Sequence, residues 1–289
     1  MGAAYGVSQS HAAAGPAAAW VVARLDRLAH RTLFAANGQG ELNGVDVRLR
    51  DHGWAVGSAC LATCARQDTL IEHWNDRRWS QVPSPNPSGT PSVNLLQSVT
   101  TVSGRDAWAA GYVEQRTSTR PVVMHWNGTR WSTVPSPGRT SNSEISSVSS
   151  ASARDIWAVG DYGETLSHPL IEHWVGAVCA DHCERAKPPS RVVILHWNGR
   201  RWAVAVSPNP GAASALGAVS ATSATNAWAV GQYCTKACAL PLIGGSQGQV
   251  LILHWNGARW SRVTAPSLGR GEHILASVRC PAAAPGLSA

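Results

Sequence analysis

Six of the seven cysteines form three pairs with the same spacing, and these pairs are the clearest chemical feature of the sequence. Each pair has three residues between its members and follows a stretch similar to Trp-Ala-Val-Gly. The pairs are Cys60/Cys64, Cys179/Cys183 and Cys234/Cys238. A four-residue offset in a hairpin loop permits the Cα separation that a disulfide requires. The sequence therefore favours three loop disulfides over free thiols, and with them an oxidising compartment.

A metal site is the weaker interpretation of the same cysteines. Structural zinc favours tighter cysteine spacing and needs four ligands that converge. The pair Cys179/Cys183 encloses Asp181 and His182, which makes it the best metal candidate, whereas Cys280 is left over. We expect neither a metal nor a cofactor.

Histidines and acidic residues recur with a repeated pattern, which indicates structure rather than catalysis. Five histidines precede a Trp in one repeated word: His73, His125, His173, His196 and His254. Glu72 and Glu172 share one place beside it. A second place, two residues before another Trp, holds His52, Asp106, Asp155 and Asn226. We expect this second set to cap turns. No phosphate loop, nucleophile elbow or zinc-hydrolase helix is present, so no catalytic residue is assigned.

The short sequence motifs that contain these residues recur four times, and the spacing within each motif is constant. From the Val of an inner strand to the Trp of Trp-Ala-Val-Gly the step is nine residues in each copy, and from the Trp after His to the Trp after Arg it is five. Between these two rigid pieces the distance varies, with values of 20, 18, 40 and 27. Two hairpins joined by a variable loop are therefore repeated along the chain.

The local sequence agrees with β-hairpins. Asn127-Gly128, Asn198-Gly199 and Asn256-Gly257 suit a tight turn, while Asn75-Asp76 is a weaker turn former. Prolines after each unit end the hydrogen-bonded ladder. Four short strands per roughly 50 residues predict one blade of a β-propeller. The fold class is therefore all-β, a propeller of about four to five four-stranded antiparallel blades, incomplete or open unless the ring closes in a way that the sequence does not reveal.

Twelve tryptophans hold recurring places, and we expect them to fill the gaps between blades rather than form a platform for sugar rings. They are Trp54, Trp74, Trp79, Trp108, Trp126, Trp131, Trp157, Trp197, Trp202, Trp228, Trp255 and Trp260. A blade cannot bury both of its faces alone, so neighbours must cover them.

The stretches LNGVDVRLRDHGWAVG and SSVSSASARDIWAVG resemble the inner strands of photosystem-assembly-factor-like and BNR (sialidase-like) propellers. The whole unit, with HWNGTRW and VPSP, also resembles tandem repeats of uncharacterised actinobacterial and chloroflexal proteins. The resemblance covers about residues 42–278 and implies the fold but no ligand. The full sialidase Asp-box and the double glycine of kelch blades are absent.

The predicted division of the chain is uneven at its ends and in its third unit. Residues 1–41 form an Ala-rich extension, read as a short helix or as disordered, and residues 280–289 a disordered tail. Between them, residues 42–279 hold blades near 42–88, 95–138, 145–210 and 216–267 and an orphan strand at 274–279. The third blade carries Trp174 in an extra word, which indicates either a deletion that fused two blades or a loop insertion.

The net charge of +7 raises the question of a nucleic-acid partner. We do not predict one, because much of the arginine sits at one repeated position before a Trp: Arg78, Arg130, Arg201 and Arg259. No apolar stretch is long enough for a membrane span, and the first 20 residues lack the pattern of a secretory signal. The paired cysteines nevertheless favour an extracytoplasmic location.

These observations favour a non-enzymatic binding or scaffolding module whose ligand is a protein or a glycan. Its three cysteine-bearing loops would provide recognition. One alternative is a glycoside hydrolase or lyase, for which Glu114, Asp161 and Glu164 are the candidate carboxylates. Another is an incomplete gene product without a settled activity.

Overall fold

The computed structural model describes residues 39–49, 52–60, 66–87, 93–115, 118–137, 142–163, 190–211, 213–234, 249–265 and 278. All regular secondary structure within these ranges is β-strand. The strands, in chain order, are β1 (Gln39–Leu49), β2 (His52–Cys60), β3 (Gln67–Trp74), β4 (Trp79–Gln81), β5 (Val93–Ser103), β6 (Asp106–Gln115), β7 (Ser118–Trp126), β8 (Trp131–Thr133), β9 (Ser143–Ser152), β10 (Asp155–Gly163), β11 (Ser190–Trp197), β12 (Trp202–Val204), β13 (Ala213–Ser223), β14 (Asn226–Cys234), β15 (Gln249–Trp255) and β16 (Trp260–Val263).

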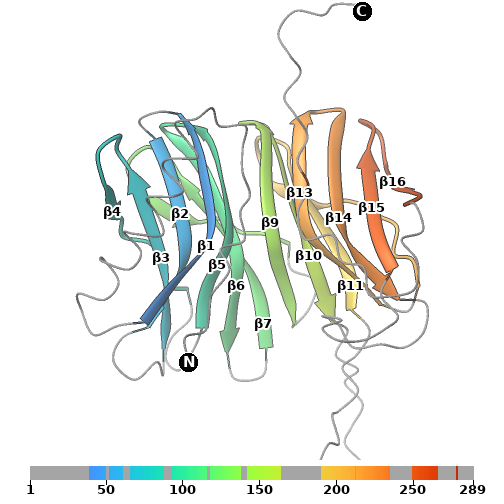
Figure 1. The fold of residues 1–289 in the computed structure, drawn as a ribbon, viewed down its shortest axis with the longest axis horizontal. Helices are drawn as coiled ribbons and strands as arrows, with labels where there is room; N and C mark the ends of the chain where they lie inside the picture. Colours follow the sequence, from blue (N-terminus) through green and yellow to red (C-terminus); the bar gives the residue numbers. More distant parts are fainter. Residues whose placement is uncertain are drawn as a thin grey trace, which may run out of the picture.

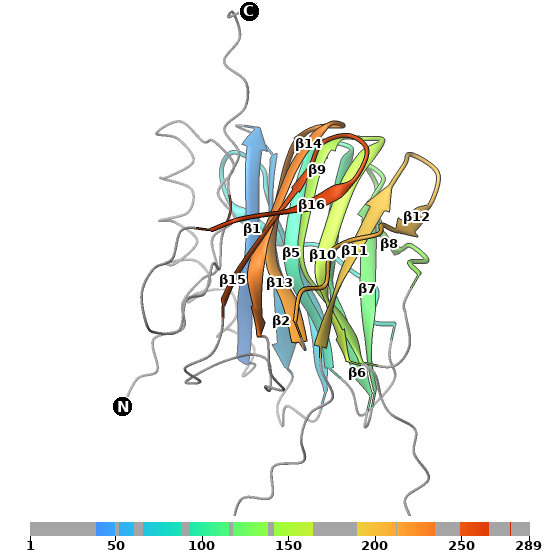
Figure 2. The same cartoon turned by 90° about the vertical axis from the view of Figure 1, so that its right-hand side faces the viewer.

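Every four consecutive strands form one antiparallel blade, which confirms the predicted fold class. A parallel bridge between Gln67 of β3 and Val93 of β5 links the sheets of the first two blades within the described residues. The four blades stand side by side, with β1, β5, β9 and β13 as their first strands (Figures 1 and 2). Predicted features in residues 1–38, 164–189 and 279–289, including Trp174 and both interpretations of the third blade, lie outside the described residues.

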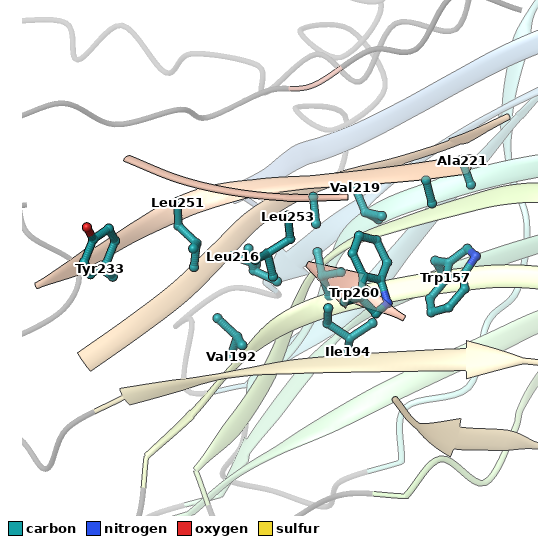
Figure 3. Packing of buried hydrophobic residues seen from close by; sticks show 13 residues of the cluster. Trp157, Val192, Ile194, Leu216, Val219, Ala221, Tyr233, Leu251, Leu253 and Trp260 are labelled. Atoms are coloured by element: carbon teal, nitrogen blue, oxygen red, sulfur yellow. The ribbon is translucent and has the colours of Figure 1, made fainter. Parts of the chain in front are cut away.

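The blades pack through three separate buried clusters, one at each junction. The first cluster joins blades one and two, the second joins blades two and three, and the third joins blades three and four. Figure 3 shows the third, where Trp157, Val192 and Ile194 of one blade meet Leu216, Leu253 and Trp260 of the next. None of the clusters formed by the described residues joins the fourth blade back to the first. The described blades therefore form an open arc.

One tryptophan geometry is repeated at all three junctions. Trp54 has its ring centroid 4.9 Å from that of Trp126 and 5.0 Å from that of Trp131 in the next blade. Trp108 meets Trp197 and Trp202 in the same way, at 4.9 and 5.5 Å, and Trp157 meets Trp255 and Trp260 at 4.9 and 5.1 Å. In each case the second partner stands edge-on, which is a favoured arrangement for aromatic pairs. Trp54, Trp108 and Trp157 are only 1–2% exposed as a result.

The first strands of neighbouring blades are tied by hydrogen bonds from side chains rather than by a backbone ladder. The amide of Thr101 donates to Asp46 Oδ2 at 2.6 Å. At the next junction the Val148 amide donates to Ser98 Oγ at 3.1 Å, and at the last the Ala221 amide donates to Ser149 Oγ at 3.1 Å. These groups are buried, where an unpaired amide is costly. Short polar side chains in the earlier blade thus satisfy the backbone of the later one.

The glycine of the Trp-Ala-Val-Gly word is required by a close approach between two strands. A Cβ on Gly57, Gly111, Gly160 or Gly231 would lie about 2 Å from a carbonyl oxygen of the first strand of its own blade. The register of each first strand shifts beside this glycine. Such shifts are β-bulges, which bend and twist a strand.

The predicted tight turns join the third and fourth strands of each blade. Gly128, Gly199 and Gly257 have φ near +90°, and Asp76 takes the corresponding place in the first blade with φ of 70°. The side chain of the preceding Asn accepts the amides of the two residues that follow, as Asn127 Oδ1 does from Thr129 and Arg130 at 3.0 Å. These contacts hold the outer hairpin in a fixed geometry.

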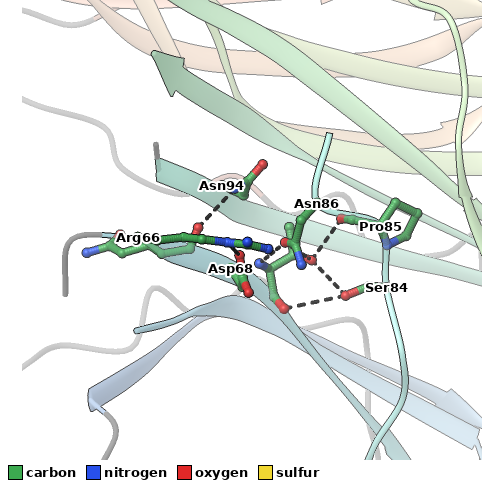
Figure 4. Close-up of polar contacts among 8 residues, drawn as sticks. Arg66, Asp68, Ser84, Pro85, Asn86 and Asn94 are labelled. Carbon is green, nitrogen blue, oxygen red and sulfur yellow. Dashed lines mark hydrogen bonds and ion pairs between the residues drawn. The ribbon is translucent and has the colours of Figure 1, made fainter. Parts of the chain in front are cut away.

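The proline-containing tail of the first blade folds back on β3 (Figure 4). Asn86 Oδ1 accepts the Thr69 amide at 2.7 Å, and the Thr69 hydroxyl donates to the carbonyl of Pro85 at 3.0 Å. Asn209 repeats this contact on the amide of Val192 in the third blade. The tail therefore does more than stop the ladder, because it covers the start of the third strand.

The tryptophan geometry predicts that Trp228 of the fourth blade contributes less to stability than its counterparts in the other blades. No pair of tryptophans packs against Trp228 among the described residues. Trp157→Ala should cost about 3–5 kcal/mol of unfolding free energy because it opens a cavity at a junction. Trp228→Ala should cost less, on the order of 1–2 kcal/mol, because the side chain is only half-buried. Denaturant midpoints followed by tryptophan fluorescence and circular dichroism measure both. Equal losses would contradict the open arc.

Candidate functional site

Each blade has two different ends along its strand direction, and all four blades are aligned with the same end on the same side. In each blade the turn between the first and second strands and the turn between the third and fourth strands lie at one end, which we call the turn end. In the second blade the start of the second strand pairs with the end of the third, Ala107 with Trp126, so the turns before and after these residues lie together. Ile156 and Trp197 pair in the same way in the third blade. The opposite end, where β2, β10 and β14 terminate, we call the loop end. The turn end is uppermost in Figure 1.

At the turn end of blades two and three, a histidine, a tryptophan and an aspartate form one unit. His125 Nε2 lies 2.9 Å from Asp106 Oδ1, and its ring stacks on Trp108 with centroids 4.3 Å apart. In the third blade His196 Nε2 lies 2.7 Å from Asp155 Oδ1, and its ring stacks on Trp157 at 4.1 Å. An N–H on Nε2 donates to the carboxylate in both units. Each histidine is therefore held by one polar and one aromatic contact.

The first and last blades replace the aspartate but keep the arrangement. In the fourth blade His254 Nε2 lies 3.0 Å from Asn226 Oδ1, which also accepts the indole N–H of Trp228 at 3.0 Å. In the first blade His52 Nδ1 lies 3.1 Å from His73 Nε2, so one ring donates and the other accepts. A unit that persists when its acid changes to an amide or an imidazole does not depend on acid–base chemistry. It locks the start of the second strand to the end of the third.

The expectation that the residue at the start of the second strand caps the turn is wrong for Asp106 and Asp155, which bond to histidines. It is confirmed for Asn226, whose Nδ2 donates across the turn to Thr222 Oγ1 at 2.9 Å. The turn amides are instead served by a serine two residues earlier. Arg105, Arg154 and Thr225 donate their amides to the hydroxyls of Ser103, Ser152 and Ser223 at 3.2–3.3 Å. The acids or amide at the start of the second strand point sideways to the histidine of the third strand. Sequence spacing alone does not reveal this cross-strand contact.

The loop end gathers carboxylates around Tyr112. Burial, followed by the nearby charges of Glu144, Glu114 and Glu41, raises the pKa of Tyr112 above its ordinary value. Of the candidates for a glycoside hydrolase, Glu114 belongs to this group, and Asp161 lies beside Glu144 as its cross-strand partner. Glu164 lies outside the described residues.

Two members of that group, Glu41 and Glu144, were not among the residues selected from the sequence. Each lies near the start of the first strand of a blade, where no repeated word marks it. The described residues contain no group of three or more histidines, cysteines or acids arranged to hold a metal ion.

Of the six cysteines predicted to form disulfides, the described residues include Cys60 and Cys234. Cys60 and Cys234 are the last residues of β2 and β14, both are buried, and both are disulfide-bonded. The other predicted members, Cys64, Cys179, Cys183 and Cys238, lie outside the described residues, as do Asp181, His182 and Cys280. The specific pairing therefore stays a prediction. Cys60 and Cys234 nonetheless occupy the same place in the first and fourth blades, at the loop end.

Glu72 is a buried carboxyl in the first blade. It is 2% exposed, and its Oε2 has no hydrogen-bond partner among the described residues. Burial raises its pKa above the ordinary carboxyl value. Met124, Leu195 and Leu253 pair with the same alanine of the Trp-Ala word in the other blades. The first blade thus places a carboxyl where its neighbours place an apolar side chain.

No family model matches the chain, and no curated protein matches it in sequence. Among solved structures, the chain is similar to one described as "YCF48 bound to D1 peptide", with a TM-score of 0.37 and 12% sequence identity. The similarity covers 80% of this chain and 56% of that one, so the chain spans little more than half of that protein's length. Within the described residues, no helix is long and apolar enough to cross a membrane.

The raised pKa of Glu72 predicts a pH-dependent loss of stability. The folded state holds a proton on this carboxyl more readily than the unfolded chain, so its stabilising contribution is present below the ordinary carboxyl pKa and is lost as the pH rises through the raised value. Glu72→Gln should match the parent in acid and exceed it in stability at neutral pH. Urea midpoints across this pH range measure the effect, with the exposed Glu114→Gln as the control. A destabilised Glu72→Gln protein at neutral pH would contradict this account.

Proposed function

We propose that the protein is a non-enzymatic binding or scaffolding module, in which the loop end of the arc takes a protein or glycan ligand. One observation carries the proposal. The strands β2, β10 and β14 all terminate at the loop end, and the segments that follow them, 61–66, 164–189 and 235–248, differ in length and sequence. Loops of varied sequence on a rigid β scaffold are where recognition is commonly placed.

The contacts at the turn end support a non-enzymatic reading. Imidazole and carboxylate groups that would serve a hydrolase as base and acid are bonded to each other and stacked on buried tryptophans in blades two and three. The same unit is repeated across the arc with the acid exchanged. Enzymatic sites instead combine unlike groups that converge on one reacting atom.

We further propose that the module works outside the cytoplasm, since Cys60 and Cys234 are disulfide-bonded and disulfides persist in oxidising compartments. The three predicted pairs would leave Cys280 as the one thiol.

Replacement of residues 165–188 by a short Gly-Ser segment tests the loop proposal. This segment contains both Cys179 and Cys183, so no cysteine of that pair is stranded. The variant should unfold with a midpoint close to that of the parent but lose the ligands that the parent binds on a glycan array and in crosslinking to candidate proteins. The control exchanges residues 116–117, the short β6–β7 connection at the same end, for Gly-Ser. Unchanged binding by the loop variant, or its failure to fold, would overturn the proposal.

Alkylation of unreduced, folded protein followed by intact mass tests the compartment proposal. Protein from an exporting host should accept one alkyl group out of seven cysteines, and all seven after reduction. Reduction should also lower the denaturant midpoint, because each closed loop restricts the unfolded chain. Seven alkylated cysteines in folded, unreduced protein would mean that the loops carry free thiols, and the extracytoplasmic location would lose its support.

A further inference from the structure

The turn end carries a concentration of arginine that neither the tryptophan packing nor the proposed loop site uses. The two turns of each blade contain eight arginines among the described residues, all of them exposed: Arg77, Arg78, Arg105, Arg130, Arg154, Arg200, Arg201 and Arg259. The described residues of the same turns include three carboxylates, Asp76, Asp106 and Asp155, of which the last two are bonded to histidines. The turn end is therefore strongly basic.

None of these eight guanidinium groups has a hydrogen bond or ion pair in the part of the chain that the structure describes. Two arginines outside these turns do have partners, whereas the exposed Arg120 at the loop end has none among the described residues. Arg66 is paired with Asp68 at 2.5 Å, and Arg262 lies over the ring of Tyr233 with its Cζ 4.5 Å from the centroid. Within the described residues, the arginines of the turn end thus stand ready for a partner from outside.

The backbone that bears these arginines is fixed in every blade. The amides of Arg78, Arg130, Arg201 and Arg259 each donate to the side chain of an asparagine three residues earlier at 3.0–3.1 Å. The residue that follows each of them is a buried tryptophan. The arginine side chain therefore starts from the same backbone position in the turn of every blade.

A second row of arginine is fixed by packing rather than by a turn. A Cβ on Gly128 would lie 3.1 Å from Arg105 Cγ, and one on Gly199 would lie 2.9 Å from Arg154 Cγ. The stems of these two arginines thus lie against the outer hairpin, while the charged heads remain exposed. Arginine commonly buries its stem and keeps its head in water.

We propose that the turn end is a binding surface for an anionic polysaccharide, whose carboxylate or sulfate groups pair with the arginines of successive blades. A guanidinium binds such groups through two parallel hydrogen bonds. Sites that recur once per blade at one level fit a polymer with recurring charges better than a peptide with one defined sequence.

Single-stranded nucleic acid fits this surface less well than a charged glycan. Its bases require exposed aromatic faces for stacking, and the tryptophans nearest the turns are used internally. Trp126, Trp197 and Trp255 are half-buried against Trp54, Trp108 and Trp157. The indole N–H of Trp255 also donates to the carbonyl of Ala224 in the adjacent turn at 2.9 Å.

Binding to polygalacturonate and to dextran sulfate, measured by affinity electrophoresis and calorimetry, tests the proposal. The parent should bind both polymers, bind neutral dextran far more weakly, and lose affinity as salt is added. The variant Arg130→Gln/Arg201→Gln keeps the stems and removes two charges at the turn end. Its affinity should fall by on the order of tenfold, since exposed ion pairs each contribute little alone.

The matched control is Arg66→Gln/Arg120→Gln, which removes two charges at the loop end and should bind nearly as the parent does. Thermal midpoints verify that both doubles are folded. Equal weakening in the two doubles would show an effect of net charge alone and would overturn the proposal. So would tighter binding of single-stranded DNA or polyglutamate than of either polysaccharide, or no binding of any polyanion. The variant that lacks residues 165–188 should still bind polysaccharide, which separates this surface from the proposed loop site.

Discussion

The covering of one blade's tryptophan by two tryptophans of the next is the interaction on which the architecture depends. A four-stranded blade has two apolar faces and cannot bury either one by itself. The rings of Trp126 and Trp131 in the second blade cover Trp54 of the first blade, and the same geometry recurs at the next two junctions. Because all three rings of each set come from rigid hairpins, the spacing of nine and five residues within the words cannot vary. The connection between the hairpins is under no such constraint, so it is free to differ in length.

The hydrogen bonds between first strands add direction to this packing. Tryptophans alone would allow neighbouring blades to slide along each other, because the hydrophobic effect is not directional. The buried bonds from the amides of Thr101, Val148 and Ala221 to side chains of the preceding blade fix the level at which strands meet. As a consequence, the turn ends of all four blades come together, and so do the loop ends. Any surface that extends over several blades relies on this alignment.

Much of this architecture could be predicted from the sequence because it depends on residue types that adopt few alternative local structures. Tryptophan at fixed spacing, glycine after asparagine and proline after the last strand each indicate one local structure. The glycine of Trp-Ala-Val-Gly was visible as a repeat, but its reason, the approach of a carbonyl oxygen within about 2 Å of where a Cβ would stand, requires coordinates. The serines and threonines between first strands were not predicted, since these residues are common in exposed strands and carry no signal of a buried partner.

The side-chain partners were harder to predict than the elements. Asp106 and His125 are 19 residues apart, and only the pairing of β6 with β7 brings them within 2.9 Å. Glu41, Glu114 and Glu144 come from three strands of different blades and meet near Tyr112 only in the assembled arc. The arginines show the opposite case. Their repeated position before a tryptophan indicates a structural role, which holds for the backbone, whereas their exposed side chains make no hydrogen bond or ion pair among the described residues. A repeated residue can therefore serve the fold through its main chain while its side chain remains available for a ligand.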